Sequence, residues 1–170
     1  MPLRVLRCLG GSLPAPLAFQ RGDLRLATWN CAALAHGSSH IRRKRVARLH
    51  RLLRCSDVVA LQETHASFET FTAIMPALCD DFEVFAAAGA TVATGGVAFL
   101  LRRSAFEEGA HFIVDTFAQG RVLRCSVVGA AKTISFWNFH FFNIEPADLM
   151  GCLNGLRKDL RDSRSHPDAC

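Results

Sequence analysis

Three apolar segments of this 170-residue chain each end at a polar side chain that is able to hold a metal ion or a phosphate group. The end residues are Asn30 after residues 24–29, Glu63 after residues 58–62, and His140 after residues 134–139. In open α/β sheets, ligands bind beyond the carboxyl ends of the strands, so polar groups at these positions indicate chemistry rather than packing. An amide, a carboxylate and an imidazole at one sheet edge predict a metal-assisted phosphoester site.

The first half of the chain alternates between extended and helical patterns. We predict a strand at Leu24–Asn30 and a helix over about 40–54 that Ser38 or Ser39 caps. A strand follows at residues 58–62, whose unbroken apolar run is typical of a strand covered on both faces. Ser67 then caps a short helix that ends near Pro76.

The second half of the chain is mostly extended. Strands are predicted at residues 82–86, 96–102, 112–117, 121–128 and 133–139. The short connections between the last three strands predict antiparallel hairpins. A closing helix begins at Pro146, and its apolar face is predicted to carry Leu149, Leu153, Leu156 and Leu160.

This order of elements predicts the α/β class, with one mixed sheet that carries helices on one face. No repeat or linker divides the chain, so we expect a disordered leader or targeting segment at 1–22, one domain at 23–162 and a polar tail at 163–170. The other apolar face of the sheet needs a second layer, and the chain is expected to end before it supplies one.

Composition narrows the class of protein. Half of the residues are hydrophobic, which excludes a disordered chain. The sequence contains no run of about 18 apolar residues, so no membrane-spanning helix is predicted. Seven cysteines without a C-x-x-C pair favour a reduced intracellular setting, nuclear or cytoplasmic. The first 22 residues hold three arginines and no acid, so a mitochondrial or plastid transit segment is an alternative. Cys31, His36 and His40 imitate zinc-ligand spacing but lack a fourth ligand.

The net charge of +5 originates in one segment, Ile41–Arg54, which holds seven basic residues and no acid. A basic element of this kind attracts polyanions, and Arg42, Arg43, Lys44 and Arg45 are candidate nucleic-acid contacts. The alternative is a solvated outer helix face without a binding role.

Five motifs, in this order and spacing, resemble the endonuclease/exonuclease/phosphatase superfamily. They are Leu26–Asn30, Asp57–His65, Gly95–Phe99, Gly120-Arg121 and Asn138–His140. The Leu-Gln-Glu-Thr-His sequence is similar to the endonuclease domains of non-LTR retrotransposons and to apurinic-type endonucleases. The resemblance covers residues 24 to about 162.

The resemblance implies a four-layered, DNase I-like α/β sandwich with two packed sheets and outer helices, which cleaves phosphoesters with Mg²⁺ or Mn²⁺. By motif match, Glu63 is the metal-binding carboxylate and Asn30 lies beside it, holding metal or phosphate. His140 contacts the scissile phosphate and Asn143 helps to bind it. Other readings stay open: Glu63 as a helix cap, Asn30 as a turn residue, and His140 as a core imidazole.

The chain departs from the family pattern in two places. The family continues with a strand that ends in Asp-x-Asn, which activates the attacking water, and with an Asp-His pair near its end. Neither occurs here; residues 165–168, Ser-His-Pro-Asp, have the wrong order, and Ala32 stands where some members carry an acid. The chain therefore resembles the N-terminal two-thirds of a domain, expected to bind Mg²⁺ weakly and to hydrolyse little alone.

Three functions are compatible with these observations. The first is a metal-dependent phosphodiesterase of the endonuclease type that acts on nucleic acid. The second is an inactive domain remnant that binds nucleic acid or a partner chain, and the third is a phosphoesterase for a small molecule or lipid. No obligate protein partner can be inferred. The sequence contains no G-x-S-x-G elbow and no phosphate-binding loop of the GK[ST] type, which argues against serine hydrolases and nucleoside triphosphatases.

Overall fold

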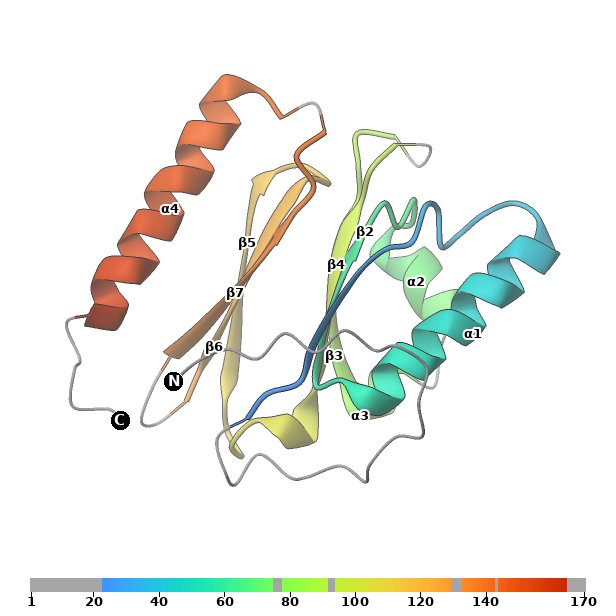
Figure 1. The fold of residues 1–170 in the computed structure, drawn as a ribbon, viewed down its shortest axis with the longest axis horizontal. Coiled ribbons are helices and arrows are strands. Elements are labelled where there is room, and N and C mark those ends of the chain that lie inside the picture. The colour runs from blue at the N-terminus through green and yellow to red at the C-terminus, as the bar shows by residue number, and fades with distance from the viewer. Residues whose placement is uncertain (1–22, 75–77, 92–93, 130–132, 143, 165–170) are drawn as a thin grey trace.

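The computed structural model describes residues 23–74, 78–91, 94–129, 133–142 and 144–164 (Figure 1). Its first sheet has four strands in the order β1-β2-β4-β3. These strands are β1 (Leu26–Asn30), β2 (Val58–Gln62), β3 (Phe82–Ala87) and β4 (Val97–Arg102). β1 and β2 are parallel, whereas β4 is antiparallel to both β2 and β3, so this sheet is mixed, as predicted.

Helices cover one face of the first sheet. The long helix α1 (Ser39–Cys55) connects the parallel strands β1 and β2, and α2 (Phe68–Ile74) and α3 (Leu78–Asp81) follow β2. Basic and apolar residues alternate along α1. The apolar residues Leu49 and Leu53 pack inward, in one hydrophobic cluster with Val59 and Leu61 of β2. The helix thus buries one stripe and exposes the other, which is the arrangement expected of an amphipathic helix at a protein surface.

The predicted hairpins form a separate sheet. Its strands are β5 (His111–Ala118), β6 (Val122–Val128) and β7 (Thr133–Phe139), and the described pairings, β5 with β6 and β6 with β7, are antiparallel. The chain leaves the first sheet through a short 3₁₀ helix at Arg103–Ala105, just after β4. The last helix, α4 (Pro146–Arg164), covers the outer face of this second sheet (Figure 1).

The prediction from the residue pattern, a single mixed sheet with one uncovered face, is therefore wrong, whereas the two packed sheets with outer helices that the family resemblance implies are confirmed. The hairpins pack against the first sheet, and the residues buried between the sheets include Val58, Phe99, Leu123 and Phe136. Four layers result: helices, sheet, sheet and helix (Figure 1). The residue pattern shows that a strand is buried but not which element buries it. The pattern alone therefore did not predict the division of the strands into two sheets. The prediction that β2 is covered on both faces is confirmed, because Val58 faces the second sheet while Val59 faces the helices.

Helix α4 packs with a face that is rotated from the predicted one: Leu149 and Leu156 are half-buried, as predicted, whereas Leu153 and Leu160 are exposed. Its buried contact is made through Cys152, and a side chain on Gly155 would collide with the rings of Trp137 and Phe117. Asp159 accepts hydrogen bonds from Trp137 Nε1 at 2.8 Å and from Arg124 at 2.6 Å. Three large apolar side chains of the helix remain exposed as a consequence: Met150, Leu153 and Leu160.

Outside the described residues lie the predicted leader at 1–22 and most of the predicted tail, from residue 165 on. No helix among the described segments is both long and apolar enough to span a membrane.

The ends of the two parallel strands are held by a buried ion pair. Arg25 donates to both carboxylate oxygens of Asp57, at 2.9 Å through Nε and at 2.7 Å through Nη2, and its backbone N–H donates at 3.0 Å. Arg102, at the end of β4, lies 3.6 Å from the same carboxylate. Burial raises the pKa of Asp57, but the hydrogen bonds and charge of Arg25 outweigh it, and the net effect is a lowered pKa.

We expect Asp57→Ala to lower the free energy of unfolding by about 3–5 kcal/mol, because it leaves the half-buried Arg25 without its partner. Glu83→Ala is the matched control: it removes an ion pair with the largely exposed Arg103 and is expected to cost about 1 kcal/mol or less. Since the pKa of Asp57 is lowered by folding, its contribution is complete above its ordinary pKa and disappears as the pH falls through the folded value. Urea denaturation of both variants, in neutral and in acidic buffer, measures these differences; equal losses in the two variants would contradict the assignment.

Candidate active site

The parallel pairing of β1 and β2 brings two of the predicted site residues to one sheet edge. Asn30 is the last residue of β1 and lies in register with Gln62, the last residue of β2, so Glu63 follows directly beside it. After the strands end, the two chains stay together: Cys31 donates from its backbone N to Gln62 O at 2.9 Å, and Ala33 donates to Glu63 O at 2.7 Å.

The backbone at this edge is strained. The non-glycine residues with positive φ in the described chain are Ala32 and Ala33 in the first loop and Glu63 and His65 in the second, with φ between 46° and 72°. Each such residue costs on the order of 1 kcal/mol or more, and strain of this kind clusters at functional sites. The sequence gives little signal of this strain, because alanine and glutamate are not typical of this conformation.

A glycine pair closes the site from the side of β4. Thr64 N donates to Gly96 O at 3.1 Å, and His65 N donates to Gly95 O at 3.0 Å. A β-carbon on Gly96 would lie 2.4 Å from Thr64 Oγ1, and the φ of Gly96 is +89°. The Gly-Gly motif is therefore required by the close approach of the loop after β2.

His140 comes to the same edge from the second sheet. Its backbone N donates to Arg121 O at 2.8 Å, which extends the pairing of β6 with β7 by one step. The ring then reaches across to the first sheet, where Nε2 lies 3.1 Å from Glu63 Oε1. Two residues that are far apart in the sequence and belong to different sheets thus form a direct contact.

Arg121 decides which nitrogen of His140 carries the proton. Its Nη1 lies 2.8 Å from His140 Nδ1, and a guanidinium has only N–H donors. Nδ1 must therefore accept, which leaves the proton on Nε2, where it is donated to the Glu63 carboxylate. The three side chains form a chain of hydrogen bonds in which the histidine is neutral and oriented from both sides.

The side chain of Asn30 stabilises the ionised form of Glu63. The Asn30 Oδ1 atom accepts from Ala32 N at 3.0 Å, which turns the NH₂ group of the amide toward Glu63. A hydrogen bond from Asn30 is the largest influence on the pKa of Glu63; burial opposes it, and the neighbouring His140 adds to it, so the pKa is lowered. The Glu63 side chain is 32% exposed, which keeps a carboxylate edge open to a ligand from solvent.

Two side-chain amides between the sheets form a hydrogen-bond network beside the contact of Glu63 with His140. Gln62 Nε2 donates to Thr28 Oγ1 at 3.0 Å and to Asn138 Oδ1 at 2.6 Å. Asn138 in turn donates to Leu61 O and Ala98 O, at 2.9 and 3.0 Å. Three residues of the site were not predicted from the sequence, although each belongs to one of the five motifs: Arg121, Gln62 and Asn138. Their position in those motifs was the available signal.

The four residues of α1 that the sequence predicted as nucleic-acid contacts have different surroundings. Arg43 and Lys44 are exposed and Arg42 is half-buried. Arg45 donates to Ala33 O and so secures the loop after β1, which makes it a structural contact of the site rather than a free basic side chain. Asn143 lies outside the described residues.

The zinc alternative finds no support in the described part of the chain. Cys31 is buried with a pKa raised to about 12 by desolvation, and its Sγ atom donates to Gln62 O at 3.0 Å. No three His, Cys, Asp or Glu side chains of the described residues lie close enough together to hold a metal ion. A metal at Glu63 would therefore depend on one carboxylate, an amide and water.

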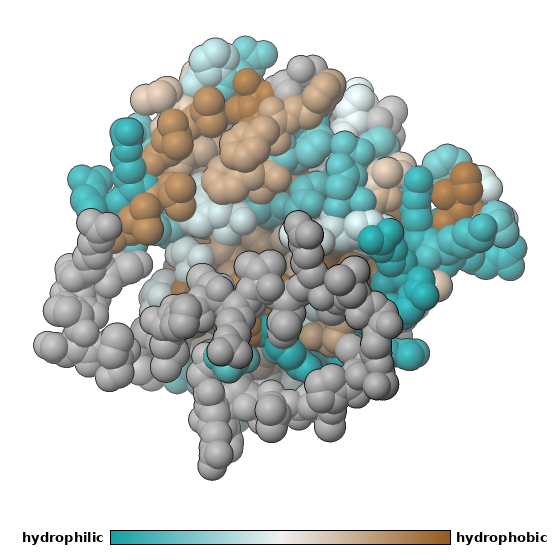
Figure 2. Space-filling view, in the orientation of Figure 1, coloured by the Kyte–Doolittle hydropathy of each residue, from teal (hydrophilic) through white to brown (hydrophobic). Residues whose placement is uncertain are grey.

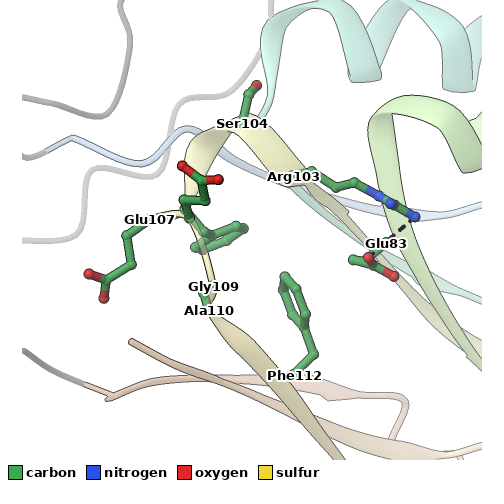
Figure 3. Close-up of a pocket in the computed structure, with 9 residues that line it drawn as sticks. Glu83, Arg103, Ser104, Glu107, Gly109, Ala110 and Phe112 are labelled. Carbon is green, nitrogen blue, oxygen red and sulfur yellow. Dashed lines mark ion pairs between the residues drawn. The ribbon is translucent and has the colours of Figure 1, made fainter. Parts of the chain in front are cut away.

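A separate cavity of about 460 Å³ lies at the opposite end of the strands (Figure 3). Its apolar floor includes Phe106 and Phe112, whose rings meet edge to face at 5.8 Å, and Glu107 and Glu108 lie at its border. Since β4 runs from the Glu63 edge at Val97 to Arg102, this cavity is separated from the site by the length of the strand. The candidate active site is thus an open sheet edge and not this cavity.

Comparison with known proteins establishes the family to which this chain belongs. The family model described as "Endonuclease/Exonuclease/phosphatase family" matches residues 27–168. The chain belongs to the endonuclease/exonuclease/phosphatase family. The resemblance seen in the five motifs is confirmed.

Two solved structures of TDP2 from Caenorhabditis elegans, one of them with selenomethionine, share the fold. Each is 17% identical over 79% of this chain, with TM-scores of 0.51 and 0.50. This chain covers 42% of either structure, less than half of its length. No curated protein sequence is significantly similar to the chain. At this identity, the likeness shows that the endonuclease/exonuclease/phosphatase fold is present.

The hydrogen-bond chain predicts the tautomer of His140. We expect ¹⁵N NMR at about pH 7 to show the proton on Nε2, and Arg121→Met to weaken this preference, because the Arg121 donor to Nδ1 is lost while Glu63 still accepts from Nε2. His111, which is exposed at the start of β5, serves as the internal reference. A proton on Nδ1 in the unmodified chain would contradict the assignment.

Proposed function

We propose that this chain forms part of a divalent-metal-dependent phosphodiesterase site of the endonuclease type, and that its substrate is nucleic acid. The observation that carries the proposal is the contact between Glu63, Asn30 and His140 at the carboxyl edge of the parallel strands. An ionised carboxylate, a donor amide and an oriented imidazole are groups that metal-assisted hydrolysis of a phosphodiester uses to hold the ion and the phosphate. Family membership supports the reaction class.

The donor set at this edge suits Mg²⁺, with Mn²⁺ as an alternative. Mg²⁺ takes one or two carboxylates and keeps several water molecules, so a single partly exposed Glu63 with a lowered pKa is adequate. Asn30 would orient that carboxylate and stand beside the ion. When bound, the ion supplies polarisation of the phosphoryl oxygen and neutralises charge on the leaving oxygen.

The protein's own groups position the phosphate. In the absence of substrate, the Nε2–H of His140 donates to Glu63, and a phosphate oxygen bound at this edge would compete for the same proton donor. Arg121 keeps the ring in the donating tautomer and adds positive charge behind it. Arg43 and Lys44, exposed at the start of α1, add attraction for a polyanion at the same end of the sheet.

An alternative follows from what the sequence lacks. Without the Asp-x-Asn and Asp-His motifs, this chain contains no residue matched to water activation, so by itself it would bind nucleic acid more readily than cleave it. Hydrolysis of a small phosphoester, such as an inositol phosphate or a lipid head group, is a third outcome that the same assays distinguish.

Metal binding is tested without any activity. In about 10 mM MgCl₂ at constant ionic strength, we expect the melting temperature of the chain to rise by roughly 2–5 °C, because an ion that binds only the folded state stabilises it. Glu63→Gln is expected to abolish the rise, whereas Glu108→Gln, at an exposed position away from the site, is expected to retain it. An unchanged rise in Glu63→Gln would show that the wrong ligand has been assigned.

Cleavage is tested separately on supercoiled plasmid. We expect slow nicking at most, dependent on Mg²⁺ or Mn²⁺ and absent in Glu63→Gln, with a loss on the order of 10²-fold or more in His140→Gln. Inositol phosphates and lipid head-group phosphates serve as comparison substrates in the same buffer. Rapid nicking by the isolated chain, or nicking that survives Glu63→Gln, would contradict the proposal.

A further inference from the structure

A row of parallel aromatic rings leads along the outer face of the second sheet to the candidate active site. Trp137 and Phe139 are two residues apart on β7, so their side chains lie on the same face, the one that α4 covers. Their rings are stacked with centroids 5.6 Å apart and an angle of 8° between the planes. Phe117 joins the row at the other end, 4.8 Å from Trp137.

Phe141 ends this row in solvent. Its ring is stacked on Phe139 with centroids 5.1 Å apart and planes at 7°, which continues the row by one more ring. The side chain is 65% exposed, as is that of Phe142, and no large apolar side chain among the described residues is more exposed. Exposed aromatic surface of this extent is unfavourable in water, at roughly 25 cal/mol per Å², and is therefore a sign of a binding surface.

The neighbouring charge is positive. The guanidinium carbon of Arg121 lies 5.6 Å from the centroid of the Phe142 ring, and the His140 ring lies 6.4 Å from it. The same Arg121 side chain is hydrogen bonded to His140, so the exposed Phe142 ring, next in the chain to Phe141, and the proposed phosphate-binding group share one cation. An aromatic surface beside a cation is complementary to a nucleotide, which offers a flat base and a negative phosphate.

The other exposed apolar surface lacks these properties. Figure 2 shows hydrophobic side chains gathered over α4 and toward the upper end of the second sheet. On α4 they are the aliphatic side chains of Met150, Leu153 and Leu160, which offer no aromatic face. This contrast separates a general apolar surface from the stacked rings beside His140.

We propose that Phe141 is a stacking platform for an unpaired base of single-stranded nucleic acid, with the adjoining phosphate directed toward Arg121 and His140. The placement of the phosphate rests on the proposed function, whereas the stacking of the base does not. A ring that lies flat on Phe139 presents its other face to a planar group, while a ring that enters a lipid layer has to project from its neighbours. The geometry thus favours a base over a membrane.

The test measures binding in EDTA, where neither metal binding nor cleavage contributes. A fluorescent single-stranded oligothymidylate is titrated with the full chain, beside a strand of equal length that has the sugar-phosphate backbone without bases. We expect Phe141→Ala to weaken binding of the oligothymidylate on the order of 5- to 100-fold, to leave binding of the abasic strand unchanged, and Phe141→Trp to restore the affinity. Phe141→Leu, which keeps apolar area without a π-face, is expected to behave like Phe141→Ala.

Leu160→Ala is the matched control, because it removes an exposed apolar side chain on α4 and is expected to change neither affinity. Equal losses for both strands in Phe141→Ala, or an affinity restored by leucine, would overturn the proposal. So would a Phe141→Ala variant that retains oligothymidylate binding but loses binding to vesicles of phosphatidylcholine and phosphatidylserine, since this result assigns the ring to a membrane. Absence of plasmid cleavage, by contrast, would count against the proposed function and leave this binding result intact.

Discussion

The side-chain amide of Asn138 is the contact on which the geometry of the site depends. It is fully buried between the two sheets, where its NH₂ group donates to Leu61 O on β2 and to Ala98 O on β4. Its oxygen accepts from Gln62, so each polar group of the amide has a partner. A buried amide with these partners permits one alignment of β7 against the first sheet, because any shift would leave polar atoms unsatisfied in an apolar layer.

The position of His140 follows from that alignment. Successive side chains of a strand point to opposite faces, so Asn138 and His140 share the face toward the first sheet, whereas Trp137, Phe139 and Phe141 share the face toward α4. One strand therefore contributes both the imidazole of the proposed catalytic edge and the aromatic row beside it. The hydrogen bond from Gln62 to Asn138 places Glu63, the first residue after β2, opposite His140.

Electrostatic interactions set the charge of Glu63 at this sheet edge, and hydrogen bonds maintain the strained backbone of the two loops. Asn30 and His140 both stabilise the ionised form of Glu63, which keeps the carboxylate charged in a partly buried place. The positive φ values of Ala33 and Glu63 are maintained because the two loops are hydrogen bonded to each other and Arg45 holds the first of them. At the opposite end of the strands, the Arg25–Asp57 ion pair holds β1 and β2 together. The parallel strands are thus fixed at both ends, and the polar groups at the carboxyl edge need not hold the sheet together.

The sequence by itself determined the elements and the candidate residues. Local patterns placed the strands and α1 within one or two residues of their observed bounds, because periodicity and capping act over a few neighbouring positions. The motifs identified Asn30, Glu63 and His140 as residues that the fold brings together. The family resemblance implied two packed sheets, although the residue pattern alone did not. Only the tertiary structure decided the rest: the face of α4 that is buried, the role of Arg121 in setting the His140 tautomer, and the strained loops. These features depend on contacts between residues far apart in the chain, such as the 76 positions that separate Gln62 from Asn138, and the free energy of such contacts leaves no periodic trace in the sequence.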